Sequence, residues 1–150
     1  MLSRAAETPD DVAVFDARSR LTYAQLELES AQLAARLQRL GAGAERCVGL
    51  LVERSASFVV SALAVLRTGA AYVPLDPSTP LERAAFALAD SDVVALVVQP
   101  RKVEGVPEGA WATIDIDDFT WSGTASFADF ASDPQSLAYV VYTSGSTGRP

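Results

Sequence analysis

The chain alternates short apolar runs with longer stretches in which apolar and polar residues recur at helical spacing. Four of the apolar runs are predicted to form β-strands: residues 12–16, 47–52, 71–75 and 93–98. The run at 93–98 contains no polar residue, which is typical of a strand that is buried on both faces. Helices placed between such strands predict an α/β fold with a mostly parallel sheet and flanking helices.

The first long helix is predicted from a capping signal. Thr22 is followed three residues later by Gln25, the spacing of a capping box in which each side chain bonds the other residue's backbone N–H. Residues 17–20, just before this cap, are predicted to form a turn. Four leucines then lie on one face of a helix that stops at Gly41: Leu26, Leu33, Leu37 and Leu40.

Two further helices are predicted from similar signals. Ser55 is the expected N-cap of a helix that ends at Gly69. Thr79 and Glu82 have the spacing of a second capping box, with Pro80 at the first helical position. This third helix is expected to run to about residue 90.

The pattern weakens between residue 99 and about residue 135, where proline, glycine and aspartate recur. The best strand in this region is at 111–116. Asp115, Asp117 and Asp118 near its end are interpreted as a solvated acidic surface rather than a metal site. Residues 137–142 are predicted to form a final strand, followed by a loop at 143–150.

Composition excludes several kinds of chemistry. With 150 residues, of which 49% are hydrophobic, the chain is large and apolar enough to bury a core. It has no histidine, which excludes triads and proton relays that use one. Its single cysteine, Cys47, cannot form an internal disulfide, and this composition argues against a zinc site. Cys47 lies in an apolar run and is interpreted as a core residue.

The distribution of charge argues against a polyanionic partner. The formal net charge of −7 arises wholly from residues 76–150, and neither half of the chain has the basic patch that binding to nucleic acid requires. No apolar run approaches the roughly 20 residues of a membrane span. The first residues turn acidic too early for a signal peptide. We therefore expect a cytoplasmic protein with no nucleic-acid and no membrane partner.

The segment with the clearest chemistry follows the last predicted strand and consists of Thr143, Ser144, Gly145, Ser146, Thr147 and Gly148. Glycine lets the backbone approach a ligand closely, so that backbone N–H and hydroxyl groups can converge on a phosphate. The segment lacks the Walker spacing and its lysine. Taken alone, it would suit a flexible linker better than a ligand site.

Three segments, in the expected order, carry a resemblance to a known family. Residues 137–150, Leu-Ala-Tyr-Val-Val-Tyr-Thr-Ser-Gly-Ser-Thr-Gly-Arg-Pro, closely resemble the phosphate-loop motif of adenylate-forming (AMP-binding) enzymes in its nonribosomal peptide synthetase form. Residues 21–26 and 66–77 resemble the first and second core motifs of such adenylation domains. Within the second motif, Tyr72 is expected to pack and Asp76 to bond nearby backbone N–H groups.

The resemblance implies an enzyme that activates an amino acid with ATP as an aminoacyl-adenylate. The aminoacyl group would then pass to the phosphopantetheine thiol of a carrier (thiolation) domain in nonribosomal peptide synthesis. ATP and Mg²⁺ are the implied cofactors of the complete domain, and a neighbouring condensation domain is an implied partner. By the same resemblance, the six residues from Thr143 to Gly148 would hold the β- and γ-phosphates of ATP.

The resemblance also implies that residues 1–150 are an incomplete adenylation domain, namely the N-terminal portion of its large subdomain, truncated inside the phosphate-loop motif. No catalytic residue and no metal ligand is expected within them, and the fragment alone is predicted to be inactive. Two alternatives stay open: an acyl-CoA or aryl acid ligase of the same superfamily, and a non-catalytic interaction or scaffold fragment. A small P-loop nucleotidase is disfavoured by the missing lysine.

Overall fold

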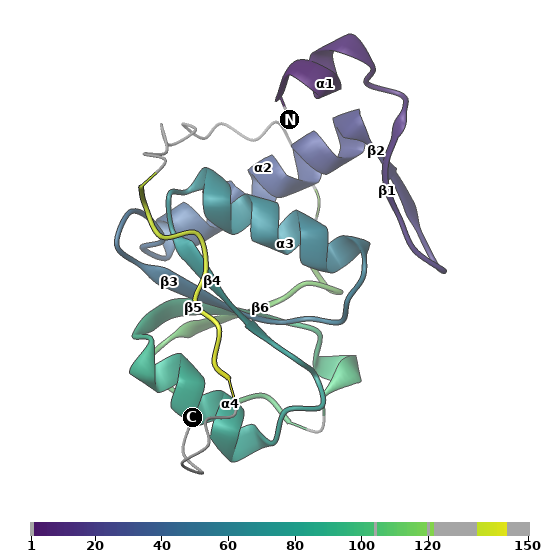
Figure 1. Cartoon of the computed structure of the whole chain (residues 1–150). Coiled ribbons are helices and arrows are strands. Elements are labelled where there is room, and N and C mark those ends of the chain that lie inside the picture. The colour runs from purple at the N-terminus through teal and green to yellow at the C-terminus, as the bar shows by residue number, and fades with distance from the viewer. Residues whose placement is uncertain (1, 104, 120, 122–134, 144–150) are drawn as a thin grey trace.

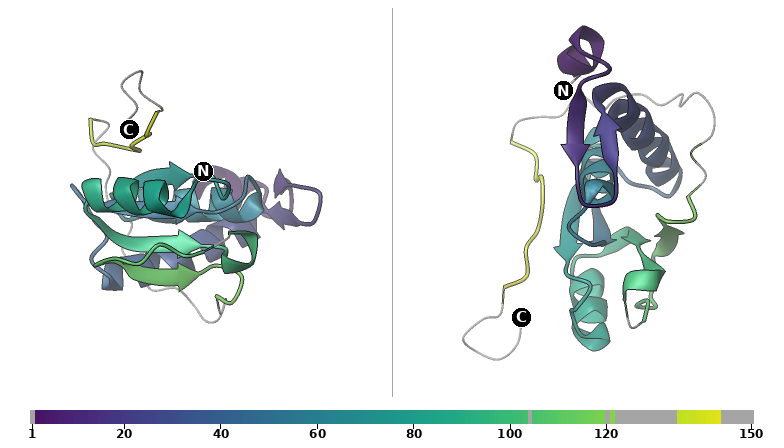
Figure 2. Two further views of the ribbon diagram at one scale, coloured as in Figure 1. Left: turned by 90° about the horizontal axis from the view of Figure 1, so that it is seen from below. Right: turned by 90° about the vertical axis from the view of Figure 1, so that its right-hand side faces the viewer.

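The computed structural model describes residues 2–103, 105–119, 121 and 135–143, in which a sheet lies between two layers of helices (Figures 1 and 2). This arrangement confirms the predicted α/β class. The elements follow in the order α1 (Leu2–Glu7), β1 (Val12–Phe15), β2 (Arg20–Thr22), α2 (Tyr23–Arg39), β3 (Cys47–Leu51), α3 (Ala56–Arg67), β4 (Ala71–Leu75), α4 (Leu81–Asp90), β5 (Val93–Val98), the short 3₁₀ helix η1 (Pro100–Lys102) and β6 (Ala112–Asp115).

The main sheet has four parallel strands in the order β4-β3-β5-β6. β3 lies inside the sheet, with Gly49 opposite Val73 of β4 on one side and Leu96 of β5 on the other. Because all four strands run in the same direction, their carboxyl ends lie at one edge of the sheet. The strands predicted at 47–52, 71–75, 93–98 and 111–116 are all confirmed, each to within one residue at either end.

Helices cover both faces of this sheet. α2 and α3 pack against one face, where the fully buried side chains include Leu33, Leu37, Val48, Leu50, Val60, Val65 and Val97. α4 packs against the other face, in a second cluster that contains Leu51, Val73, Ala84, Ala87, Leu88, Leu96 and Val98. The interior strand β5 therefore contributes to both clusters, as its unbroken apolar sequence predicted. Over the described residues, none of the helices combines the length and the apolar character needed to cross a membrane.

Gly49 allows α4 to lie close to the sheet. A Cβ atom built on Gly49 would overlap Leu88 Cδ2 and would lie 3.0 Å from Leu96 Cδ1. Both leucines are fully buried, so neither can turn into solvent to make room. The glycine is therefore required by packing.

β1 and β2 form a separate antiparallel hairpin, in which Phe15 pairs with Arg20. The prediction of a turn over residues 17–20 is wrong at Arg20, which is the first residue of β2. The turn is tighter than predicted because the Asp16 backbone N–H donates to the Ser19 carbonyl oxygen at 3.0 Å. This bond closes the turn one residue earlier and leaves Arg20 free to pair.

The capping box at the start of α2 is confirmed. The Gln25 backbone N–H donates to Thr22 Oγ1 at 3.2 Å, and the Thr22 backbone N–H donates to Gln25 Oε1 at 2.9 Å. The helix ends at Arg39, just before Gly41, whose φ of 93° lies in the left-handed region that glycine adopts without strain. Both boundaries agree with the pattern of the sequence.

The second predicted capping box does not form. α4 begins at Leu81 with Pro80 as its N-cap, and no side chain caps it. Thr79 instead belongs to the preceding turn, because its backbone N–H donates to the Asp76 carbonyl oxygen at 2.8 Å. The helix therefore begins at Leu81, one residue later than the Thr79–Glu82 spacing predicts, and Pro80 takes the N-cap position predicted for Thr79.

Residues 137–142 lie beside β4 without forming the predicted strand. In the described part of the chain they make one β-bridge, between Tyr139 and Tyr72. The Tyr72 N–H donates to the Ala138 carbonyl oxygen at 3.1 Å, and the Val140 N–H donates to the Tyr72 carbonyl oxygen at 3.0 Å. The segment then leaves β4 and continues toward α4 (Figure 1), which ends the pairing after a single residue.

Replacing Gly49 with alanine is expected to weaken the packing of α4 on the sheet. The overlap with Leu88 should lower the free energy of opening of β3 and β5 by about 1–3 kcal/mol. Amide hydrogen exchange of peptides from these two strands measures this change. Gly43→Ala is the matched control, since a Cβ on Gly43 meets no atom within 4 Å; equal protection in both variants would contradict the packing role.

Candidate functional site

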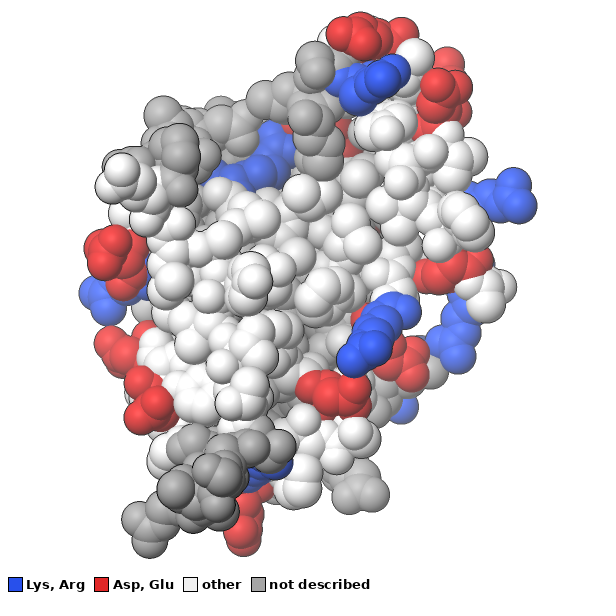
Figure 3. Space-filling model, in the orientation of Figure 1, with Lys and Arg blue, Asp and Glu red and all other residues white. Residues whose placement is uncertain are grey.

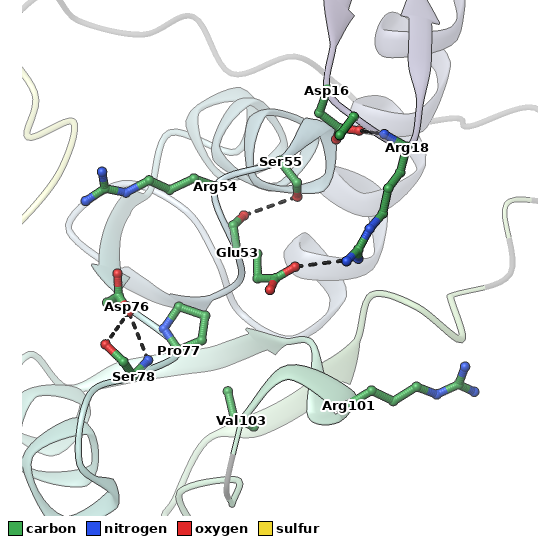
Figure 4. A pocket seen from close by; sticks show the side chains of 11 residues that line it. Asp16, Arg18, Glu53, Arg54, Ser55, Asp76, Pro77, Ser78, Arg101 and Val103 are labelled. Carbon is green, nitrogen blue, oxygen red and sulfur yellow. Dashed lines mark hydrogen bonds and ion pairs between the residues drawn. The ribbon is translucent and has the colours of Figure 1, made fainter.

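The carboxyl ends of β3 and β4 face a cleft of about 880 Å³ (Figure 4). In α/β folds this edge of the sheet is the usual position of a ligand site. The cleft is bordered by the hairpin turn, by the residues that follow each strand and by η1. Its charged lining residues are Asp16, Arg18, Glu53, Arg54, Asp76 and Arg101.

The charges in this cleft are balanced and loosely paired. Arg18 Nη1 lies 3.8 Å from Glu53 Oε2, and Arg101 Nη2 lies 3.6 Å from Asp118 Oδ1; all four side chains are substantially exposed. Exposed pairs of this kind contribute little to stability. The side chains of Arg54 and Arg101 point away from the middle of the cleft (Figure 4). Among the described residues that line the cleft, the cations therefore do not converge on one point where a phosphate could bind.

Asp16 joins the hairpin to the start of α3. Its Oδ1 accepts bonds from the backbone N–H groups of Arg18 at 2.7 Å and Ser19 at 2.8 Å. Its Oδ2 accepts the backbone N–H of Ala56 at 2.8 Å, at the first residue of α3. The bond from Ala56, followed by those from Arg18 and Ser19, lowers the pKa of Asp16 from 3.8 to about 2.

Ser55 occupies the predicted N-cap position of α3, but its hydroxyl donates to the Glu53 carbonyl oxygen at 3.1 Å and makes no capping bond. Asp16 performs that role from 40 residues away. The sequence analysis missed this residue. An aspartate three residues before a serine signals the turn itself, but no local pattern signals the bond to α3.

Asp76 holds the turn after β4, as the sequence predicted. Its Oδ1 accepts the Ser78 backbone N–H at 2.9 Å and the Ser78 hydroxyl at 2.6 Å. These two bonds, that from the hydroxyl first, lower the pKa of Asp76. Tyr72, in the same motif, packs between the rings of Phe58 and Tyr139, with centroid distances of 6.2 and 5.7 Å. These contacts confirm that Tyr72 packs and that Asp76 bonds a nearby backbone N–H group, as the sequence predicted.

Of the six residues predicted to bind phosphate, Thr143 is exposed and ends the described part of the chain. Ser144, Gly145, Ser146, Thr147 and Gly148 lie outside the described residues. Tyr142, immediately before Thr143, lines a second cleft of about 670 Å³. Asp76 and Ser78 line the same cleft, so the structure brings the second motif and the start of the phosphate-loop motif to one site.

Tyr142 is a second residue of interest that the sequence analysis missed. Its hydroxyl donates to Asp90 Oδ2 at 2.6 Å and lies 2.8 Å from Ser91 Oγ. Burial, followed by the bond to Asp90, raises the pKa of Tyr142. The hydroxyl is therefore protonated near neutral pH, and its O–H donates a hydrogen bond to the Asp90 carboxylate.

The acidic residues near β6 bond one another's backbone. Asp115 Oδ1 accepts the N–H groups of Asp117 at 2.9 Å and of Asp118 at 3.4 Å. Asp117 Oδ1 accepts the Gln99 side-chain amide at 3.0 Å. Within the described ranges, no group of three or more candidate metal ligands is found.

Cys47 is partly buried, and desolvation followed by the nearby charge of Asp92 raises its pKa.

Comparison with known proteins adds independent evidence. The family model described as "AMP-binding enzyme" matches residues 2–150. The chain is 41% identical over 148 residues to tyrocidine synthase 3 of Brevibacillus parabrevis, and 38% identical over 148 residues to surfactin synthase subunit 2 of Bacillus subtilis. These alignments cover 98% of this chain but 2% and 4% of the two relatives, so the chain spans a small part of their length.

Solved structures give the same result for the fold. The crystal structure of the nonribosomal peptide synthetase FmoA3 in its α-methyl-L-serine-AMP bound form matches with a TM-score of 0.85 at 24% identity, over 95% of this chain and 16% of that one. The Klebsiella oxytoca NpsA N-terminal subdomain in complex with 3-hydroxybenzoyl-AMSN matches with a TM-score of 0.81 at 26% identity, over 99% of this chain and 37% of that one.

Replacing Asp16 with asparagine is expected to loosen the hairpin from α3 and to lower Tm by about 2–5 °C near neutral pH. The folded-state pKa is depressed, so the contribution of the carboxylate is complete above about 3.8 and is lost as pH falls through about 2. Thermal unfolding of both proteins from pH 7 to pH 2 should show the difference shrinking over that window. Asp10→Asn is the control, because the Asp10 carboxylate accepts no hydrogen bond from a described residue; a difference that persists unchanged at pH 2 would contradict the assignment.

Proposed function

Because the chain belongs to the AMP-binding enzyme family, we propose that residues 1–150 are part of an adenylation domain of a nonribosomal peptide synthetase. The observation that carries the proposal is the family match across residues 2–150. Identities of 41% and 38% to tyrocidine synthase 3 and to a surfactin synthase subunit support that branch of the family. Since the chain spans 2% and 4% of these two relatives, we propose the activity for a complete domain of which residues 1–150 would be a part.

The proposed reaction has two steps. A carboxylate oxygen of the amino acid attacks the α-phosphorus of ATP, the bond from that phosphorus to the bridging oxygen breaks, and pyrophosphate leaves with the electron pair. The phosphopantetheine thiol of the carrier domain, as its thiolate after loss of a proton to solvent, then attacks the carbonyl carbon of the aminoacyl-adenylate; the bond from that carbon to the phosphate oxygen breaks, and AMP leaves with the electron pair. In the first step the protein must orient two anions and stabilise the charge that accumulates on pyrophosphate.

We assign the second of these tasks to Thr143, Ser144, Gly145, Ser146, Thr147 and Gly148, which would hold the β- and γ-phosphates. The donor set fits, because hydroxyl and backbone N–H groups bond phosphate oxygens without needing a cation. Thr143 supports the assignment, since it is exposed and follows a segment fixed against β4 and α4. These residues stabilise a leaving group and transfer no proton.

Use of ATP follows from the family, and Mg²⁺ is proposed as the ion that accompanies the triphosphate. It would neutralise charge on the phosphate oxygens, and the hydroxyls of the 143–148 segment are suitable partners for its water shell. We further propose an amino acid as substrate, and carrier and condensation domains as partners. The cytoplasm, where ATP is available, is the proposed location.

We also propose that residues 1–150 form an incomplete domain. Leu137, Tyr139 and Val141 are 58%, 54% and 56% exposed, so one side of the segment before Thr143 offers apolar side chains to solvent. Figure 3 shows that the middle of this face carries little charge. A surface of that kind normally contacts more protein. We propose that later residues of the longer protein cover it and complete the nucleotide site.

An aryl acid ligase is the second candidate. The NpsA subdomain that this chain resembles is described in complex with 3-hydroxybenzoyl-AMSN, a ligand with an aryl acyl group. The chain has no described residue that would distinguish an α-amino group from a benzoic acid. The alternative therefore differs from the main proposal only in the acid that is activated.

The full-length protein is expected to catalyse ATP–pyrophosphate exchange with one amino acid at least tenfold faster than with the others in a panel that includes hydroxybenzoic acids. Thr143→Ala should slow that exchange about tenfold or more, because one phosphate donor is lost. Thr113→Ala removes the same group from an exposed position on β6 and serves as the control. Preference for an aryl acid would select the second candidate, and no exchange with any acid would contradict both.

The polypeptide 1–150 on its own is expected to give no ATP–pyrophosphate exchange under conditions in which the full-length protein is active. The reason is that the proposed fragment lacks the rest of the nucleotide site and the pocket for the acid. Purified 1–150 is assayed beside the full-length protein at equal concentration. Exchange above the no-enzyme background would show that the proposed domain boundary is wrong.

A further inference from the structure

The second cleft, with a volume of about 670 Å³, lies beside the carboxyl end of β4 and carries a net positive charge. Among the described residues, its charged lining consists of Arg54, Asp76 and Arg83, two cations and one carboxylate. We infer that Arg54 and Arg83 bind the pyrophosphate part of ATP, as cationic partners of the segment 143–148. The inference rests on the proposed function and extends it, because neither arginine belongs to the phosphate-loop motif.

The pairing of the last described segment with β4 leads to this cleft. Tyr139 lies opposite Tyr72 and the two stretches run parallel, so the residues that follow each are directed to the same edge of the sheet. Thr143 comes four residues after Tyr139, and Asp76 comes four residues after Tyr72. Tyr142 and Asp76 accordingly line one cleft. Thr143 therefore follows directly on a residue that shares the cleft with both arginines.

Pro74 favours an unpaired edge of β4 at this cleft. In a parallel strand, alternate residues direct their N–H and C=O groups to the same side, and Tyr72 directs both of its groups to the segment that contains Tyr139. The next residue on that side is Pro74, which has no N–H to donate. Pairing along β4 therefore loses a bond at this point, and Pro74 lines the cleft.

The two arginines are available to an anion. Both are exposed, and neither side chain forms an ion pair or a hydrogen bond with a described residue. The bonds that Asp76 accepts from the Ser78 hydroxyl and backbone N–H, and after them the charge of Arg54, lower the pKa of Asp76. Arg54 thus acts on Asp76 through its charge without forming an ion pair with it. A guanidinium group can donate two parallel hydrogen bonds to phosphate oxygens, which suits both arginines to pyrophosphate.

The balance of charge distinguishes this cleft from the first one. The first cleft has three acidic and three basic residues in its described lining. Arg54 lines both clefts, but its side chain points away from the middle of the first (Figure 4). The segment 143–148 contains no basic residue. Two arginines beside the start of that segment would offset the negative charge that accumulates on pyrophosphate as it leaves.

The test uses the full-length protein and inorganic pyrophosphate. Arg54→Gln and Arg83→Gln should each raise the Kd for pyrophosphate about five- to tenfold by isothermal calorimetry, because a charged donor to phosphate oxygens is lost. The KM for pyrophosphate in the exchange assay should rise by the same factor, with the KM for the acid unchanged. Arg83→Lys keeps the charge without the paired donors and should have a smaller effect than Arg83→Gln.

Arg101→Gln is the matched control. Arg101 is also an exposed arginine, but it lines the first cleft and not the second. Its ion pair with Asp118, at 3.6 Å between exposed side chains, contributes little to stability. Thermal unfolding of each variant checks that it is folded, and the Kd and KM for pyrophosphate should match those of the wild-type protein for Arg101→Gln alone.

The outcomes separate this inference from the function on which it rests. If the wild-type protein exchanges pyrophosphate and either Arg54→Gln or Arg83→Gln matches Arg101→Gln, the paired site is wrong and the proposed function stands. Equal weakening of the pyrophosphate and acid interactions shows a general structural effect, which also overturns the inference. A wild-type protein that exchanges pyrophosphate with no acid overturns the proposed function itself, and this inference with it.

Discussion

Burial of the interior strands on both faces is the constraint on which the rest of this structure depends. β3 and β5 are covered on both faces, because α3, which joins β3 to β4, packs on one face of the sheet and α4, which joins β4 to β5, packs on the other. Those connections make the strands parallel and bring their carboxyl ends to one edge. The charged cleft, the turn at Asp76 and the second cleft beside Tyr142 all lie at or next to that edge. The edge of β4 remains available for pairing, and the segment that ends at Thr143 bonds there.

The elements that the sequence predicts well are those set by local chemistry or by unbroken apolar runs. β5 is predicted from six consecutive apolar residues, and the start of α2 is predicted from two side chains three residues apart, Thr22 and Gln25. The errors arise where an interaction that the sequence pattern does not indicate takes the place of the predicted one. At α4 the turn at Asp76 takes the N–H of Thr79 and thereby removes the predicted cap. After Val140 the pairing with β4 ends, and Tyr142 bonds to Asp90 of α4 where the strand was expected to continue.

The residues of the candidate site also differ in whether a pattern in the sequence indicates them. The segment from Thr143 to Gly148 was predicted from its own residues and from a family resemblance; the match across residues 2–150 shows the family, and phosphate binding by the segment stays a prediction. Asp16 and Tyr142 were not found, because their partners are 40 and 52 residues away. Ordinary residue types at such separations leave no periodic or spacing signal in one sequence. They become visible only when the sheet has placed the hairpin beside α3 and residue 142 beside α4.

The central claim is that residues 143–148 hold the β- and γ-phosphates of ATP in the longer protein. Hydrogen–deuterium exchange of the full-length protein, followed on a peptide that contains these six residues, tests it directly. The account predicts slower amide exchange in that peptide with ATP than with AMP, because only ATP has the phosphates that the backbone N–H groups would bond. Equal exchange with ATP, with AMP and without nucleotide would contradict it.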